Sequence, residues 1–145
     1  MSFSGLVVQL LNGLASASSL FLVAAGLSLI FGVMRIVNFA HGSFFMLGIY
    51  LAYTLVERLA PALGFWPALL LAPLVTGLLG AVVEVALLRR IYRAPELFQL
   101  LATFALVLVI KDAVLWAWGP EELFGPRAPG LEGAVSILGR QFPVY

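Results

Sequence analysis

The sequence predicts an all-α protein, a polytopic bundle of about four transmembrane helices. Hydrophobic residues make up 63% of its 145 residues and charged residues only 10%, whereas soluble domains carry about 25% charged residues. The mean hydropathy is +1.10. A helix needs about 20 mostly apolar residues to span a bilayer. Four stretches satisfy this requirement, with ends uncertain by a few residues: 6–34, 38–57, 66–88 and 97–118.

Charged residues, prolines and glycines separate these stretches. The residues that mark the ends are Arg35, then Glu57, Arg58 and Pro61, then Arg89 and Arg90, and finally Gly119 and Pro120. The first stretch follows no basic segment, so it is predicted to be a retained span rather than a signal peptide. Residues 1–145 therefore form a single transmembrane region. Residues 119–143 are rich in Pro and Gly and predict an outer loop, with a short strand or hairpin near Ala134–Leu138.

The distribution of basic residues predicts the orientation. Alternating spans place one group of arginines together, whereas the opposite side mixes basic with acidic residues; the first group is Arg35, Arg89, Arg90 and Arg93. The positive-inside rule then predicts a multi-pass plasma-membrane protein with its N-terminus outside. This orientation requires that 38–57 cross completely, because a re-entrant segment would reverse the order.

Composition excludes several functions. A net charge of +1 without a basic patch argues against nucleic acid. Without cysteine, and with one histidine, the chain offers neither a thiolate nor a multi-histidine metal site. His41 and Ser43 would point about 200° apart on a helix, so they cannot form a catalytic dyad. No enzyme activity, metal or cofactor is predicted for this chain.

Two polar residues, Asn38 and His41, lie in an otherwise apolar stretch. Polar groups in membrane spans usually face protein or water. At 100° per residue, one face of this span combines them with small residues and an aromatic ring: Asn38, His41, Phe45, Gly48 and Ala52. The residues expected to face lipid are Phe39, Met46, Leu47 and Tyr50. His41 is expected to hydrogen-bond a neighbouring helix, with contact to a transported solute as the alternative.

The third span also has a face of small residues with one acid: Pro73, Gly77, Gly80, Ala81 and Glu84. Glu84 is expected to pair with a basic residue such as Arg35 or Arg89, and a coupling role is the alternative. Lys111 is expected to snorkel outward. Asp112 is expected to meet another helix or subunit, with contact to solute as the alternative. The glycines expected to allow close helix packing are Gly32, Gly42, Gly48, Gly77 and Gly80.

Three runs of sequence resemble the branched-chain amino-acid ABC transporter permeases of the Liv type. They are Gly26-Leu-Ser-Leu-Ile-Phe-Gly-Val33, Asn38-Phe-Ala-His-Gly42 and Met46-Leu-Gly-Ile-Tyr50. Further matches are Glu84 with Arg89-Arg90-Ile-Tyr-Arg93, Leu101-Ala-Thr103 and Gly139-Arg-Gln-Phe-Pro-Val-Tyr145. The resemblance covers essentially the whole chain. Permeases of this family are about twice as long, so the chain is similar to their N-terminal half.

The resemblance implies a permease subunit of an ATP-driven importer in the bacterial inner membrane. Its partners would be a second permease subunit, cytoplasmic ATPase subunits that bind the ATP, and an external solute-binding protein. The substrates would be leucine, isoleucine or valine, and the mechanism alternating access. The alternatives are a related permease for urea, amides or other amino acids, a small non-transporting scaffold or regulatory subunit, and a passive channel.

Overall fold

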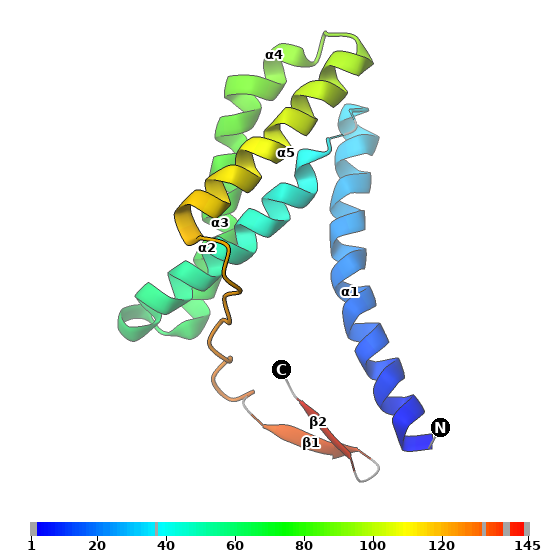
Figure 1. Cartoon of the computed structure of the whole chain (residues 1–145), viewed down its shortest axis with the longest axis vertical. Helices are drawn as coiled ribbons and strands as arrows, with labels where there is room; N and C mark the ends of the chain where they lie inside the picture. The colour runs from blue at the N-terminus through cyan, green and yellow to red at the C-terminus, as the bar shows by residue number, and fades with distance from the viewer. Residues whose placement is uncertain (1–2, 37, 132, 138–139, 144–145) are drawn as a thin grey trace. The chain divides into compact units, whose positions relative to one another are not determined.

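The computed structural model describes residues 3–36, 38–131, 133–137 and 140–143, and for residues 3, 4, 34, 135, 137, 140, 142 and 143 the backbone alone. Long helices dominate, which confirms the predicted fold class (Figure 1). The elements are α1 (Phe3–Met34), α2 (Ala40–Leu63), α3 (Phe65–Val83), the π-helical segment η1 (Glu84–Leu88), α4 (Arg89–Ile91), α5 (Glu96–Trp118), β1 (Ala134–Ile137) and β2 (Arg140–Pro143). Within the described residues, four segments are long and apolar enough to span a membrane: Gly5–Val33, Ala40–Leu63, Phe65–Ile91 and Glu96–Trp118.

The chain divides into two compact units, and α1 belongs to the first up to Gly26 and to the second from Leu27. The first unit also contains residues 127–145. There, β1 and β2 form an antiparallel hairpin in which Ala134 pairs with Pro143 and Ile137 with Arg140. The hairpin agrees with the short strand or hairpin expected near Ala134–Leu138, although Leu138 lies outside the described residues. The second unit, residues 27–126, holds α2, α3, η1, α4 and α5.

The second span extends further than predicted. The prediction that Glu57, Arg58 and Pro61 end this helix at residue 57 is wrong, because α2 continues to Leu63. Pro61 lies in the last turn, where its missing N–H removes a single backbone hydrogen bond. Gly64, with φ 89° and ψ 159°, ends the helix, and its N–H donates to the carbonyl of Ala60 at 2.9 Å. α3 begins at the next residue, so a single glycine reverses the chain.

The third span contains a change of helix type that the sequence did not predict. α3 gives way to η1 at Glu84, and the N–H of Arg89 donates to the carbonyl of Glu84, five residues earlier. π-helical turns are rare in proteins, and those that occur are often found at functional sites. The helix then continues through α4 to Ile91, so the span extends past Arg89 and Arg90, where the prediction ended it.

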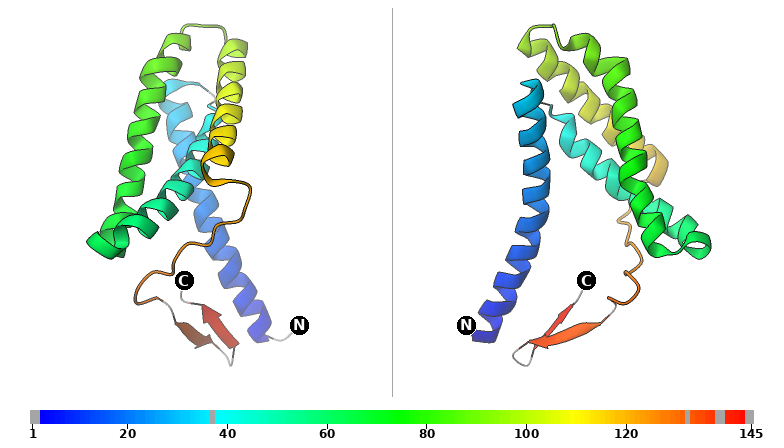
Figure 2. Two further views of the ribbon diagram at one scale, coloured as in Figure 1. Left: turned by 60° about the vertical axis from the view of Figure 1, so that its left-hand side comes forward. Right: turned by 180° about the vertical axis from the view of Figure 1, so that it is seen from behind.

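α2 contacts both α3 and α5 (Figure 2). The buried face of α5 repeats at helical spacing: Thr103, Leu106, Ile110 and Val114. The three apolar members, Leu106, Ile110 and Val114, join Ala40 of α2 and Leu88 of η1 in one core. Met46, Leu47 and Tyr50 pack against that core. The prediction that these three side chains of α2 face lipid is therefore wrong, whereas Phe39 is 53% exposed.

Trp118, at the end of α5, joins that helix to α2. Its indole Nε1–H donates to Oγ1 of Thr54 at 2.7 Å, and its ring lies 5.4 Å from that of Tyr50. Aromatic pairs at this spacing add about 0.5–1.5 kcal/mol beyond their area burial. The contact holds the end of α5 against the middle of α2.

Candidate functional site

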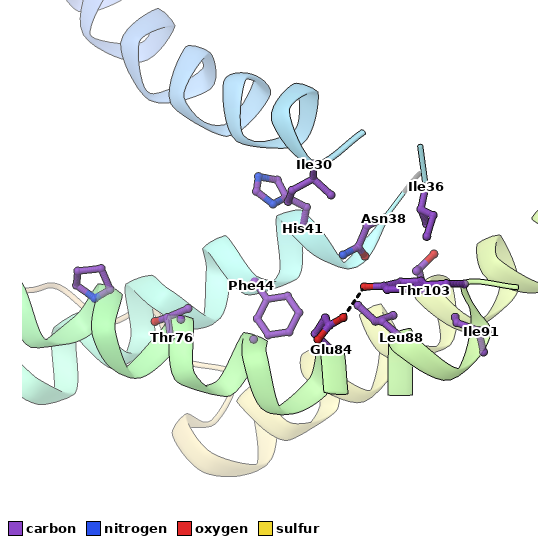
Figure 3. Close-up of a pocket in the computed structure, with 14 residues that line it drawn as sticks. Ile30, Ile36, Asn38, His41, Phe44, Thr76, Glu84, Leu88, Ile91 and Thr103 are labelled. Carbon is purple, nitrogen blue, oxygen red and sulfur yellow. Dashed lines mark hydrogen bonds between the residues drawn. The ribbon is translucent and has the colours of Figure 1, made fainter. Parts of the chain in front are cut away.

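The second unit contains a cavity of about 430 Å³ between its helices (Figure 3). This volume falls within the range of about 300–1,000 Å³ typical of small-molecule sites. Its apolar lining residues are Ile30, Ile36, Phe44, Leu88 and Ile91. One wall of α3 contributes Pro73, Gly77 and Gly80, and the polar lining residues are Asn38, His41, Thr76, Glu84, Tyr92 and Thr103. The cavity is thus largely apolar with a few convergent polar groups, as ligand sites usually are.

Asn38 lies in the connection before α2 rather than inside a span. Its Oδ1 accepts a hydrogen bond from the N–H of Ala40 at 3.0 Å, and its carbonyl accepts one from the N–H of His41 at 3.2 Å. Asn side chains favour this local bonding over continuing a helix. The second span therefore begins at Ala40, two residues after the predicted start and within its stated margin, and the Asn38 side chain helps to start the helix there.

His41 lies in the first turn of α2 and lines the same cavity. Figure 3 shows its ring turned toward Ile30 of α1 and away from Glu84. Phe44, one turn further, lines the cavity, whereas the predicted Phe45 is 49% exposed and does not. The cavity-facing side of α2 therefore passes through residues 41 and 44.

The wall formed by α3 owes its shape to small residues. Pro73, Gly77, Gly80 and Glu84 line the cavity, as one face of a helix should, but Ala81 does not. A Cβ added at Gly77 or Gly80 would meet nothing within 4 Å in the described chain. At these two positions the absence of a side chain widens the cavity.

The sequence suggested that Glu84 pairs with Arg35 or Arg89, but the structure shows no ion pair between Glu84 and either of these residues. Oε1 of Glu84 instead accepts a hydrogen bond from the hydroxyl of Tyr92 at 3.1 Å. The two residues are joined through η1 and α4, and the π-helical turn lies between them. The charged group predicted to form an ion pair thus meets a neutral donor in this structure.

The loop that carries Tyr92 is held by Gln99. Its Nε2 donates to the carbonyl oxygens of Ala94 at 2.8 Å and Tyr92 at 3.3 Å. Burial raises the pKa of the Tyr92 hydroxyl, and the hydrogen bond to Glu84 raises it further. The hydroxyl therefore keeps its proton at neutral pH and remains a donor to Glu84.

Thr103 is fully buried at the cavity; the sequence analysis quoted it within Leu101-Ala-Thr103 but did not name it as a candidate site residue. Its hydroxyl donates to the carbonyl of Leu100 at 3.1 Å, a bond within its own helix. Tyr92 and Gln99 were also missed as functional candidates. Tyr92 directly follows the end of the span at Ile91, where the chain turns back toward α5. A hydroxyl eight residues after Glu84 was the one signal in the sequence for their hydrogen bond.

The other predicted residues lie away from this cavity. Asp112 and Lys111 are exposed on α5, and within the described part of the chain neither contacts an ionic partner. Gly32 borders a second cavity, with Arg35 and Glu96. A Cβ at Gly48 would lie 3.4 Å from Oγ1 of Thr76, whereas one at Gly32 or Gly42 would meet nothing within 4 Å. Close packing inside the described chain is thus found at Gly48, and at the other glycines it stays a prediction.

Four apolar helices and a cavity between spans define a multi-pass membrane protein with a site of small-molecule size. Residues 9–138 match the family described as the branched-chain amino acid transport system permease component. Because the match covers most of the chain, this protein belongs to that family, and the resemblance drawn from the sequence is confirmed.

Two kinds of relatives are similar to parts of the chain. The high-affinity branched-chain amino acid transport system permease protein BraD of Pseudomonas aeruginosa is 29% identical over 120 residues, which cover 79% of this chain and 39% of BraD. The permease proteins LivH of Escherichia coli and Salmonella typhimurium are each 33% identical over 51 residues, 35% of this chain and 17% of LivH. The chain thus spans well under half the length of these relatives. No solved structure matches it significantly.

Proposed function

We propose that this chain forms part of the translocation path of an ATP-driven importer for branched-chain amino acids. The observation that supports the proposal most is the family match over residues 9–138. The cavity adds to it, since it combines the apolar walls needed by a branched side chain with polar groups for the ends of an amino acid. A second permease subunit, cytoplasmic ATPases and an external binding protein would complete the importer, and alternating access would move the substrate.

Uptake by the complete complex tests this function. The full-length permease, its partner subunits and the binding protein are reconstituted in proteoliposomes, and uptake of radiolabelled leucine is measured with and without ATP. We expect uptake that requires ATP. Flux without ATP would indicate a passive channel, and an assembled complex without flux would favour the scaffold or regulatory alternative.

His41→Ala is expected to lower the uptake rate about fivefold, because loss of a polar contact worth about 1 kcal/mol is expected to weaken the site or its packing. Uptake in the same proteoliposomes gives the rate, and size-exclusion chromatography gives the amount of assembled complex. If the assembled variant took up leucine with an unchanged rate and affinity, His41 would neither contact the substrate nor support the packing of the helices around it.

We further propose that the protein lies in the bacterial inner membrane with its N-terminus outside, since this orientation puts Arg89, Arg90 and Arg93 in the cytoplasm. Residues 1–145 contain no cysteine, so a single cysteine introduced there reports its own location in a permease whose remaining part is also free of cysteine. Ala94→Cys, in the loop before α5, is expected to react with a membrane-impermeant maleimide more than about tenfold faster in inside-out vesicles than in intact cells. Ser136→Cys, in the exposed hairpin, is the control and should show the opposite preference. Reversed labelling of both would place the N-terminus inside.

A further inference from the structure

The described residues that line the cavity include a negatively charged side chain but no lysine or arginine. Among the 14 described residues that line it, Glu84 is the one carboxylate, and none is lysine or arginine. A ligand with a positive group and an apolar body matches such a lining, because the positive group compensates the acid while the body excludes water from the walls. A ligand that is only anionic would find no fixed opposite charge there.

Glu84 is also incompletely compensated in its present contacts. It lies seven residues before Ile91, the end of the span. One carboxylate oxygen accepts a hydrogen bond from Tyr92, a neutral donor. Within the described residues no hydrogen-bonding or ionic partner of the other oxygen is found. Glu84 is only partly buried, and no described buried side-chain oxygen lacks a partner, so this second oxygen is accessible to a positive group that enters the cavity.

We propose that the Glu84 carboxylate binds the α-ammonium group of the transported amino acid. The inference rests on the proposed function, and it names the group that anchors the substrate in this cavity. Phe44, Leu88 and Ile91 line the same space, so the branched side chain lies against apolar walls while the ammonium takes the free positions of the carboxylate. The Tyr92 hydroxyl occupies one of those positions in this structure.

Photoaffinity labelling of the intact complex tests the proposal. The probe is photo-leucine, a leucine analogue with a diazirine in its side chain, and labelled peptides are mapped by mass spectrometry in the full-length permease with its partner subunits in nanodiscs. We expect labelling of the segments around Phe44 and Leu88. Excess leucine or 3-methylbutylamine, which keeps the ammonium, should suppress it, whereas 4-methyl-2-oxopentanoate, which lacks the ammonium, should not. Equal suppression by the oxo acid would overturn the proposal.

Two variants separate an anchoring role from a structural one. Glu84→Gln is expected to reduce labelling about tenfold or more, since a charge-assisted hydrogen bond is lost. Tyr92→Phe removes the same hydrogen bond between Glu84 and the loop but keeps the carboxylate, so labelling should be retained or increased. If Tyr92→Phe reproduced the loss seen in Glu84→Gln, the role of Glu84 would be to hold the loop, and the proposal would fail.

Glu57→Gln is the matched control, because Glu57 is exposed on α2 and does not line the cavity; its labelling should equal that of the unmodified complex. Leucine uptake by the unmodified complex separates the two proposals. Absent uptake would count against the proposed function itself. Normal ATP-driven uptake with unchanged labelling in Glu84→Gln would overturn the anchoring role alone.

Discussion

Ala68→Leu is expected to destabilise the packing of α3 on α2 by about 2–3 kcal/mol, the upper part of the range for overpacked cores. Ala68 is 0% exposed, and Ala72, one turn later, is 4% exposed. These two alanines are the buried residues of α3, the helix that packs most extensively on α2. Small residues at such a contact let two backbones approach closely, so three added carbons must push the helices apart. The measurement is the SDS mole fraction that unfolds the protein in detergent micelles, followed by circular dichroism.

Ala81→Leu provides the control for this prediction. It makes the same substitution on the same helix at an exposed position that does not line the cavity. Its free energy of unfolding should change by no more than about 0.5 kcal/mol, as for surface substitutions in general. Equal destabilisation by both variants would show that helix propensity, rather than the close contact at Ala68, determines the effect.

The spans themselves could be predicted because hydrocarbon leaves the backbone few choices. Backbone groups in a bilayer must be satisfied within the segment, so about 20 apolar residues form a helix almost regardless of which residues they are. The ends were harder to predict. Pro61 is a strong helix-breaking signal in the sequence, yet α2 ends at Gly64. A proline in the last turn costs one hydrogen bond, whereas Gly64 allows a backbone conformation that reverses the chain.

The face of α2 that meets the bundle was predicted only in part: His41 lines the cavity and Gly48 lies close to Thr76 of α3, but Met46, Leu47 and Tyr50 also pack against the core. The prediction extended a helical stripe from Asn38, but Asn38 lies before the helix and bonds to the N–H of Ala40. The buried positions in the first turn of α2 are Ala40 and Ser43. Because the segment from Phe44 to Leu51 is apolar on every side, no contrast in hydrophobicity could correct the error.

The polar contacts of Glu84 were also beyond prediction from the sequence. Arg89 follows Glu84 by five residues, whereas side chains on a straight α-helix face one another at spacings of three or four, so α-helical geometry alone does not favour that ion pair. The π-helical turn at Glu84–Leu88 changes the positions of the residues that follow it, and Tyr92 meets the carboxylate instead. A local change of helix type leaves no clear mark in a sequence of apolar residues.

Gly64→Val is expected to destabilise the protein by about 3 kcal/mol, because Gly64 has φ 89° and ψ 159°, a region that is essentially open to glycine alone. The cost comes from the backbone rather than from a clash, since a Cβ at this position would lie 3.8 Å from Cδ of Pro67, an ordinary contact. A valine side chain branched at Cβ adds to the strain. Relief of that strain would require α2 and α3 to part at the one residue that joins them.

The control for Gly64→Val is Gly42→Val, the same substitution at a helical glycine where a Cβ meets nothing within 4 Å. Valine is slightly better than glycine inside a helix, so this variant should unfold within about 0.5 kcal/mol of the unmodified chain. Both variants are compared by SDS titration, and the exposure of the α2–α3 turn is followed by limited proteolysis. A Gly64→Val protein as stable and as protease-resistant as Gly42→Val would mean that the connection between the helices can adopt another turn at no cost.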